Sequence, residues 1–396
     1  MNEKKCVVIG VTGGIAVYKI CTLVSSLKKQ GYDVHVLMSK EAEEFVSPLT
    51  FQTLSANKVI TDMFTIDYTP DVHHVSLAKK ADLFVIAPAT ANIIAKVSNG
   101  IADDMLTTTF LAANCPKLIV PAMNTQMLMN PITQDNLKKC RSYGMEVFES
   151  DSGYLACGDV GSGRLPEPKE IEDYIKQMLV TDKYLAGKKI LITAGPTSEA
   201  IDPVRMITNH STGKMGYSLA KAARNLGASV TLVTGTNLLN DIRDVEMVHV
   251  ISAEEMAQAV LKRQQDMDCM ILAAAVADYT PIEVADNKIH KKDGDMNIAL
   301  KRTKDILKTL GEHKKEGQIL IGFSMETEDV IERTKQKLVK KNCDYIVANN
   351  LKQEGAGFGT DTNIVTLISK DDEISFGRLS KYDTSMRIFE NCLRGK

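Results

Sequence analysis

The segment ITNHSTGKMGYS, residues 207–218, contains the residue types of a phosphate-binding loop, with Gly213-Lys214 ahead of an apolar run. Backbone N–H groups at the start of a helix are good donors to phosphate. A P-loop, however, needs a glycine five residues before the Gly-Lys pair and a serine or threonine after it, and Thr208 and Met215 occupy those places. The segment is therefore close to a P-loop without being one, and these residues alone leave open whether it binds a nucleotide's phosphates and for which reaction.

A second glycine-containing segment, VTGG at residues 11–14, also lies between two apolar runs. Its backbone N–H groups and the helix predicted after it can bind a phosphate. The segment lacks the full GxGxxG pattern of dinucleotide sites, so we expect a single phosphate and therefore a mononucleotide.

Both segments require a buried strand before them and a helix after them. Residues 4–10 and 188–194 predict these strands, because β-branched residues dominate two short apolar runs. Helices are predicted at 15–30 and 215–227. Further predicted strands are 33–38, 82–89, 117–122, 229–235, 267–277, 318–323 and 344–350, and residues 363–376 predict a hairpin at an antiparallel edge.

Strands that alternate with helices predict the α/β class, with two doubly wound, Rossmann-like domains built on parallel sheets. We place them at residues 1–182 and 187–396, on either side of a polar linker. Ligands of such folds lie beyond the carboxyl ends of the strands. Seven segments meet that condition: VTGG, APATAN, PAMNTQM, AGPT, NHSTGK, AAAVADY and GFSMET.

Composition excludes several classes of protein. The 396-residue chain has a net charge of −2 with acids and bases interspersed, which argues against nucleic-acid binding. No apolar run approaches the roughly 18 residues of a membrane span, and the N-terminus does not resemble a signal peptide, so we expect a cytoplasmic protein. The eight cysteines form no CxxC pair, so neither a zinc site nor a redox pair is indicated.

Three motifs in the N-terminal half resemble the flavin-dependent cysteine decarboxylase family: GVTGGIAVYK, HHVSLAKKADLFVIAPATANIIAKVSNGIADDMLTT and PAMNTQMLMNP. PAMNxxM is the most distinctive of them. The resemblance implies a flavodoxin-like flavoprotein domain. It also implies that FMN is held by Gly13, Gly14, Ser39, Ala89 and Thr90.

The same resemblance implies three catalytic residues. His74 would be the base, and a histidine suits that role because its ordinary pKa is near neutrality. Asn124 would hold the substrate carboxylate or its neighbouring amide. Cys157, in a glycine-rich stretch where a packed thiol is not expected, would donate the last proton from a flap. Asp103-Asp104 stands where the family usually has Asn-Asp, which weakens a role for Asp103.

With DSGYLACGDVGSGRLPEP and the second half, the whole chain resembles the bacterial bifunctional phosphopantothenoylcysteine decarboxylase/phosphopantothenate–cysteine ligase family of coenzyme A synthesis. The resemblance implies that CTP and Mg²⁺ activate 4′-phosphopantothenate as an acyl-cytidylate, which cysteine attacks. Asn209, Arg205 and Lys288 would be catalytic. The implied nucleotide-binding residues are Ser211, Gly213, Ala274, Asp278, Lys288, Thr303, Lys304, Asp305, Ile306, Phe323, Lys337 and Lys341; metal ligands are not indicated.

Three features of this half leave alternatives open. Asp202 either shapes the DPVR loop or forms a salt bridge with Arg205. Lys337 and Lys341 lie four residues apart on a predicted helix, so they are either solvated or face a polyanion. His290 replaces a lysine of the family pattern, which puts a role for that position in doubt.

Three rival functions are a peptidyl-cysteine decarboxylase, an FMN-binding regulatory protein and a generic NAD-dependent dehydrogenase. The first two would not need residues 188–396, and the third would need GxGxxG. The resemblance also implies a homo-oligomer with trimeric flavin domains and dimeric ligase domains, and by analogy a dodecamer.

Overall fold

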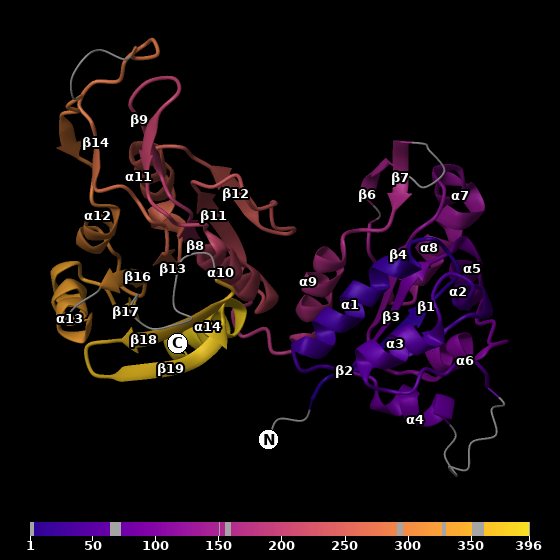
Figure 1. Ribbon diagram of the computed structural model, residues 1–396. Helices are drawn as coiled ribbons and strands as arrows, with labels where there is room; N and C mark the ends of the chain where they lie inside the picture. Colours follow the sequence, from indigo (N-terminus) through magenta and orange to yellow (C-terminus); the bar gives the residue numbers. More distant parts are fainter. Residues whose placement is uncertain are drawn as a thin grey trace. The chain divides into compact units, whose positions relative to one another are not determined.

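The computed structural model describes residues 4–63, 73–149, 151–154, 160–290, 296–326, 330–350 and 360–395. It divides into two compact units, Met1–Val180 and Thr181–Lys396, which we call the N-terminal and C-terminal domains (Figure 1). No helix in the described part of the chain is long and apolar enough to span a membrane.

The N-terminal domain is built on a five-stranded parallel sheet with the order β2-β1-β3-β4-β5. Its strands are β1 (Cys6–Val11), β2 (Asp33–Met38), β3 (Leu83–Ala89), β4 (Lys117–Pro121) and β5 (Glu146–Val147). This is the flavodoxin-like order, in which the connections change direction between β1 and β3. The predicted doubly wound parallel architecture is therefore confirmed for this half.

Helices cover both faces of this sheet, because alternate residues of each strand point to opposite sides. Val7 and Ile9 of β1 pack with α1 (Val17–Lys29), α3 (Pro48–Ser55) and α9 (Pro168–Leu179). Cys6 and Val8 face a second core that contains residues of α4 (His73–Lys80), α5 (Ala91–Asn99), α6 (Met105–Ala112) and α8 (Pro131–Ser142). Two short helices, α2 (Lys40–Glu43) and α7 (Thr125–Met129), follow β2 and β4.

The first and last helices of this domain pack against each other. Ser26 of α1 donates a hydrogen bond to Glu172 of α9 (2.5 Å), and Lys19 of α1 pairs with Glu167 at the start of α9 (2.9 Å). Between β5 and α9 lies an antiparallel hairpin of β6 (Asp151–Tyr154) and β7 (Val160–Arg164). Cys157 falls between these two strands in the sequence and lies outside the described residues.

The C-terminal domain has an eight-stranded sheet with the order β12-β11-β8-β13-β16-β17-β18-β19. Its strands are β8 (Lys189–Ala194), β11 (Ser229–Thr234), β12 (Glu246–His249), β13 (Cys269–Leu272), β16 (Ile319–Glu326), β17 (Tyr345–Asn350), β18 (Thr362–Ile368) and β19 (Glu373–Ser380). The six strands from β12 to β17 are parallel and follow the order of dinucleotide-binding folds, with the change of direction between β8 and β13. The predicted hairpin is confirmed as β18 and β19, which pair antiparallel at one edge.

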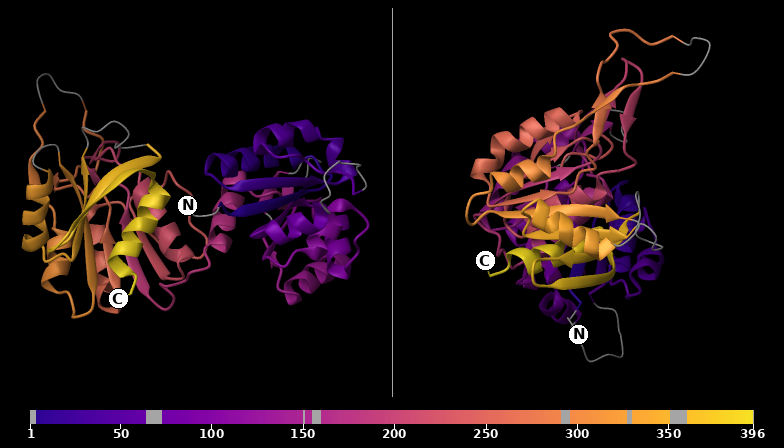
Figure 2. Two further views of the ribbon diagram at one scale, coloured as in Figure 1. Left: turned by 90° about the horizontal axis from the view of Figure 1, so that it is seen from below. Right: turned by 90° about the vertical axis from the view of Figure 1, so that its left-hand side faces the viewer.

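Helices again lie on both faces of the sheet: α10 (Lys214–Asn225), α11 (Ala253–Arg263), α12 (Ile306–Glu312), α13 (Val330–Lys340) and α14 (Lys381–Leu393), with the short 3-10 helix η1 (Gln264–Asp266). The last helix packs on the first here too, since α14 runs along α10 and the Asn225 amide donates to the Tyr382 hydroxyl at 2.9 Å. Two small ribbons, β9 (Ser198–Ala200) with β10 (Met206–Thr208) and β14 (Tyr279–Pro281) with β15 (Leu300–Arg302), extend beyond the main sheet (Figures 1 and 2).

Two predicted boundaries in this domain were wrong. The strand predicted at 267–277 ends at Leu272, because the following small residues turn toward the loop after β8. There the N–H groups of Ala274 and Ala277 donate to the side-chain hydroxyls of Thr193 on β8 and Thr197 beyond it, instead of to backbone carbonyls of a neighbouring strand. Lys341, predicted on a helix, lies just beyond the end of α13.

Candidate active sites

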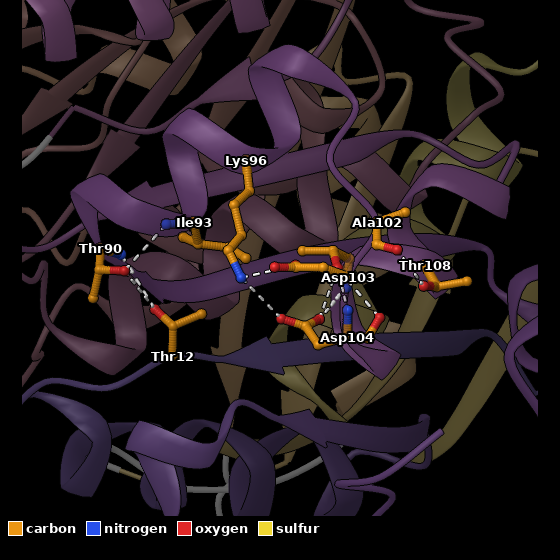
Figure 3. Close-up of polar contacts among 9 residues, drawn as sticks. Thr12, Thr90, Ile93, Lys96, Ala102, Asp103, Asp104 and Thr108 are labelled. Atoms are coloured by element: carbon orange, nitrogen blue, oxygen red, sulfur yellow. Dashed lines mark hydrogen bonds and ion pairs between the residues drawn. The ribbon is translucent and has the colours of Figure 1, made fainter. Parts of the chain in front are cut away.

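In the N-terminal domain, the loops after β1 and β3 meet where the sheet connections change direction, which is where ligands of this fold bind. The Thr12 hydroxyl donates to the Pro88 carbonyl at 2.6 Å and accepts from the Thr90 N–H at 3.2 Å. Thr90 in turn caps α5 by accepting from the Ile93 N–H at 3.3 Å (Figure 3). Thr12 was not among the predicted site residues, although its place directly before the glycine pair could have indicated it.

The predicted flavin residues occupy this edge in different ways. A Cβ on Gly13 would lie 2.3 Å from the Glu41 Cβ, whereas one on Gly14 would meet nothing within 4 Å. Gly13 thus permits close packing of the loop on α2, and Gly14 faces open space. The Ala89 side chain is buried in the core, and its carbonyl accepts from the Ala122 N–H at 3.0 Å.

Ser39, directly after β2, fits a phosphate or flavin contact. Its hydroxyl oxygen is buried and has no hydrogen-bond partner within the described ranges. A buried polar group without a partner is costly, and a bound ligand is one way to satisfy it. This orphaned hydroxyl and the open space at Gly14 are the observations by which the structure fits a bound mononucleotide.

Asp103 and Asp104 stabilise local structure beside this edge. Asp104 caps α6, since its carboxylate accepts a hydrogen bond from the Thr107 N–H at 2.7 Å. In return, the Asp104 N–H donates to the Thr107 hydroxyl at 3.1 Å. Lys96 pairs with Asp103 at 2.8 Å and with Asp104 at 3.5 Å (Figure 3). The hydrogen bond with Asp103 is the main cause that raises the pKa of Lys96.

Asn124 begins α7, and its side-chain oxygen accepts from the Gln126 N–H at 2.8 Å. Its loop is joined to β7 by the Met123 N–H, which donates to the Gly163 carbonyl at 3.0 Å, and by the Thr125 hydroxyl, which donates to the Ser162 carbonyl at 2.8 Å. A Cβ on Gly163 would lie 2.3 Å from the Met123 carbonyl oxygen, and the φ of Gly163 is +115°. The glycines of β7 therefore allow this strand to pack directly on the Asn124 loop.

His74, the predicted base, is the second residue of α4 and is half-buried. At the other end of the same helix, Lys80 pairs with Asp33 at 2.6 Å, which joins the helix to β2.

In the C-terminal domain, Asn209 joins two of the predicted loops at the point where the connections change direction. Its side-chain amide donates to the carbonyls of Ala275 (3.0 Å) and Val276 (3.3 Å), which belong to the AAAVADY segment. Gly213 begins α10 with a φ of +79°, and its N–H points to the Ser211 hydroxyl at 3.3 Å. The two loops thus lie together, as their positions after β8 and β13 predict.

Both alternatives for Asp202 hold in the structure. Its carboxylate accepts from the N–H groups of Val204 (2.8 Å) and Arg205 (2.7 Å), which shapes the loop. It also forms a salt bridge with the Arg205 guanidinium at 2.9 Å. Lys288 and His290 are exposed on the segment beside it, and the carboxylate accepts from the Ile289 N–H between them at 3.1 Å.

The remaining predicted nucleotide residues gather near the ends of β13 and β16. Thr303 donates to the Ala277 carbonyl at 2.6 Å and to the Asp278 carbonyl through its N–H at 3.0 Å. Asp278 and Lys304 are exposed, Phe323 and Ala274 are half-buried, and the Ile306 side chain is buried in the core.

The two lysines with alternative readings differ in their contacts. Lys337 donates to the Ser324 hydroxyl on β16 at 3.1 Å. Lys341 pairs with Asp305, whose carboxylate also caps α12 by accepting from the Lys308 N–H at 3.0 Å. Burial raises the pKa of Asp305, but the Lys341 contact and the cap outweigh it, so this pKa lies below its ordinary value.

Comparison with known proteins matches both domains. Residues 1–180 match the flavoprotein family model, and residues 185–394 match the model of the DNA/pantothenate metabolism flavoprotein C-terminal domain. The coenzyme A biosynthesis bifunctional protein CoaBC of Bacillus subtilis (strain 168) is 50% identical over 394 residues, which are 98% of this chain and 97% of that protein.

Two further relatives cover the chain in part. A cysteine/cysteine sulfinic acid decarboxylase from an unknown prokaryotic organism is 46% identical over 334 residues, 83% of this chain and 93% of its own. The crystal structure of the C-terminal domain of a coenzyme A biosynthesis bifunctional protein CoaBC is 46% identical, with a TM-score of 0.46, and covers 53% of this chain and 95% of that one.

Proposed function

Because this chain belongs to the family of bifunctional coenzyme A biosynthesis proteins, we propose that it couples cysteine to 4′-phosphopantothenate and then decarboxylates the product. The observation that carries this proposal is the 50% identity over 98% of the chain, which includes both domains. A protein with the flavoprotein activity alone would not need the second domain.

In the C-terminal domain, the 4′-phosphopantothenate carboxylate attacks the α-phosphorus of CTP and releases pyrophosphate. The cysteine amine then attacks the acyl-cytidylate, so that an amide forms and CMP leaves. Negative charge develops on phosphoryl and acyl oxygens, and cations or amide donors aimed at it lower the barrier. Arg205 and Lys288 would provide the cations and Asn209 the amide.

In the N-terminal domain, direct loss of CO2 from the cysteinyl group would leave a poorly stabilised carbanion. FMN, when bound, supplies the reversible two-electron chemistry that oxidises the CH2–SH to a thioaldehyde and later returns the electrons. CO2 leaves between these two steps, with its electron pair drawn toward sulfur. Because the electrons are returned afterwards, the overall reaction consumes no oxidant. His74 would take the first proton, Asn124 would orient the carboxylate, and Cys157 would donate the last proton.

The described residues fit these two cofactors differently. Ser39, Gly14 and the Thr90 loop fit FMN, because they present an orphaned hydroxyl and open space at the ligand edge of the sheet. Within the described ranges, the one group with metal-ligand spacing is Cys6, Asp33 and His35 at the opposite end of the N-terminal strands. We propose that Mg²⁺ enters with the phosphates of CTP, as it commonly does at nucleotide sites.

The test is a coupled assay on the full-length protein with 4′-phosphopantothenate, cysteine, CTP and Mg²⁺. We expect pyrophosphate release first, then phosphopantothenoylcysteine, then CO2 and 4′-phosphopantetheine, with slower turnover when ATP replaces CTP. The purified protein should be yellow, with the absorbance of a flavin.

Each failure has its own meaning. A protein without flavin would contradict the proposed decarboxylase, and absence of pyrophosphate release would contradict the proposed ligase. Because one relative is a cysteine decarboxylase, a parallel reaction contains cysteine alone. Release of CO2 and cysteamine there would favour free cysteine as the substrate instead. We also propose that the enzyme acts in the cytoplasm as a homo-oligomer, which size determination in solution would test.

A further inference from the structure

Asp202 is a buried carboxylate on a loop that is otherwise open to solvent. Its side chain is 0% exposed, whereas that of its partner Arg205 is 41% exposed. An unpaired buried charge is very costly, so a carboxylate in such a place requires a full set of donors. One oxygen accepts from the N–H groups of Val204 and Arg205, and the other accepts from the Arg205 guanidinium at 2.9 Å and the Ile289 N–H at 3.1 Å.

The bond to Ile289 joins segments that lie 87 residues apart in the sequence. The Arg205 guanidinium reinforces it by donating to the Ile289 carbonyl at 3.0 Å. A backbone bond from the Ala285 N–H to the Ile201 carbonyl, at 3.1 Å, holds the same two segments together. The backbone of Ile289 is thus hydrogen-bonded on both sides, with its N–H donating to Asp202 and its carbonyl accepting from Arg205.

The peptide group whose N–H donates to Asp202 is the one that links Lys288 to Ile289. Since the Ile289 N–H belongs to that peptide plane, the Asp202 carboxylate fixes the backbone immediately beside Lys288. Lys288 itself is exposed, so its long side chain depends on its backbone anchor for direction. The same carboxylate orients the Arg205 guanidinium, so one buried anion fixes both that cation and the backbone beside Lys288.

The charge state of Asp202 agrees with this geometry. Burial raises the pKa of its carboxyl, but the hydrogen bonds from the backbone of Val204, Ile289 and Arg205 outweigh that effect, and the net pKa lies below its ordinary value. Asp202 is therefore ionised at neutral pH and remains an acceptor for all four donors.

We propose that Asp202 is a positioning residue of the ligase site, which sets the place of Lys288, and with it Arg205, for attack of the substrate carboxylate on the nucleotide. This inference rests on the proposed ligase function. It assigns Asp202 no contact with substrate, and it predicts that the residue acts through Lys288.

The variant that tests it is Asp202→Asn, which keeps the shape of the side chain but replaces one acceptor oxygen by an NH2 group. Two of the four donors then face another donor. A small misplacement of a catalytic group can cost roughly 100-fold in rate, so we expect single-turnover pyrophosphate release to slow by roughly 10- to 100-fold. Hydrogen exchange of the 285–290 segment should become faster in the same variant.

A double-mutant cycle separates positioning from general damage. Lys288→Ala removes the group that Asp202 is inferred to position. The loss caused by Asp202→Asn should therefore be smaller in the Lys288→Ala background than in the wild type. An equal loss in both backgrounds would overturn the inference.

Decarboxylation of supplied phosphopantothenoylcysteine is the internal control, because its residues lie in the other domain. It should be unchanged in Asp202→Asn. If that variant does not fold, Asp202→Glu is the second variant, because it keeps the charge but shifts the carboxylate by one methylene. We expect slower pyrophosphate release at an unchanged melting temperature. A wild-type rate would contradict the inference.

The two readouts keep the two proposals apart. If the wild type releases no pyrophosphate, the proposed function fails, while hydrogen exchange still decides whether Asp202 holds the 285–290 segment. If the wild type is active and Asp202→Asn matches it in rate and exchange, the proposed function stands and the inference fails.

Discussion

Glu172 offers a quantitative test of how the helix that follows the Cys157 hairpin is held. Its side chain is 2% exposed and accepts from Lys169 (2.7 Å), Lys176 (2.8 Å) and Ser26 (2.5 Å). Burial raises its pKa, but the charge of Lys176 and these hydrogen bonds lower it by more, so the net pKa is about 2 instead of 4.5. The difference of about 2.5 between these two pKa values corresponds to about 3 kcal/mol of stability at neutral pH.

The sign of the pH dependence follows from this lowered pKa. Above pH 4.5 the carboxyl is ionised in both the folded and the unfolded chain, so its contribution is fully present. As the pH falls from 4.5 toward about 2, the unfolded chain takes up the proton first, and the contribution is lost. Glu172→Gln cannot titrate, so its deficit relative to the wild type should be largest at neutral pH and should shrink across this window.

The assay is urea unfolding of the full-length protein read by pulse proteolysis, which follows the two domains as separate bands. This suits a two-domain chain that contains no tryptophan. We expect Glu172→Gln to destabilise the N-terminal domain by about 3 kcal/mol near neutral pH. Asp135→Asn is the control, because Asp135 and its partner Lys138 are both 77% exposed and such pairs contribute little. Equal stability of Glu172→Gln and the wild type at neutral pH, or a deficit that does not shrink in acid, would refute the reasoning.

Three further predictions concern the two sites. Ser39→Ala removes a hydroxyl that has no hydrogen-bond partner in the described part of the chain, so the melting temperature of the apoprotein should not fall. Loss of a hydrogen bond to a charged phosphate should weaken FMN binding roughly 10- to 100-fold. Unchanged affinity in a flavin titration would exclude the contact. Gly163→Ala places a Cβ 2.3 Å from the Met123 carbonyl oxygen, so CO2 release should be lost while pyrophosphate release continues, and retained decarboxylation would show that the hairpin does not need this packing. Lys341→Ala removes the cation that pairs with Asp305 beside the proposed nucleotide site, so the KM for CTP should rise roughly tenfold with little change in kcat. The exposed neighbour Lys340→Ala should match the wild type.

Local pattern predicted most strands of both sheets, because short β-branched runs and period-3.6 runs are visible without tertiary context. Strand order was not predicted beyond a doubly wound parallel arrangement. The N-terminal sheet has the order β2-β1-β3-β4-β5 and the C-terminal sheet has the other common order of doubly wound folds, and local patterns along the chain do not distinguish the two.

The candidate sites were predicted unevenly. The loops that follow strands were found, because their position after a strand is itself a sequence signal. Contacts across long separations were not: Thr12 reaches Pro88 across 76 residues, and Asp202 reaches Ile289 across 87. The end of β13 at Leu272 was missed for the same reason, since the hydroxyls of Thr193 on β8 and Thr197 in the loop after it accept the hydrogen bonds that a continuing strand would have made.

In each domain the last helix packs on the first helix, and this affects how the chain folds during synthesis. α9 closes the N-terminal domain on α1 by residue 179, so that domain can complete its core and accept flavin while the second is still being made. The C-terminal domain cannot do the same, because α14, at residues 381–393, covers α10, which begins in the loop that contains Asn209. A ribosome stalled after residue 340 would thus carry a finished flavoprotein and an unfinished ligase.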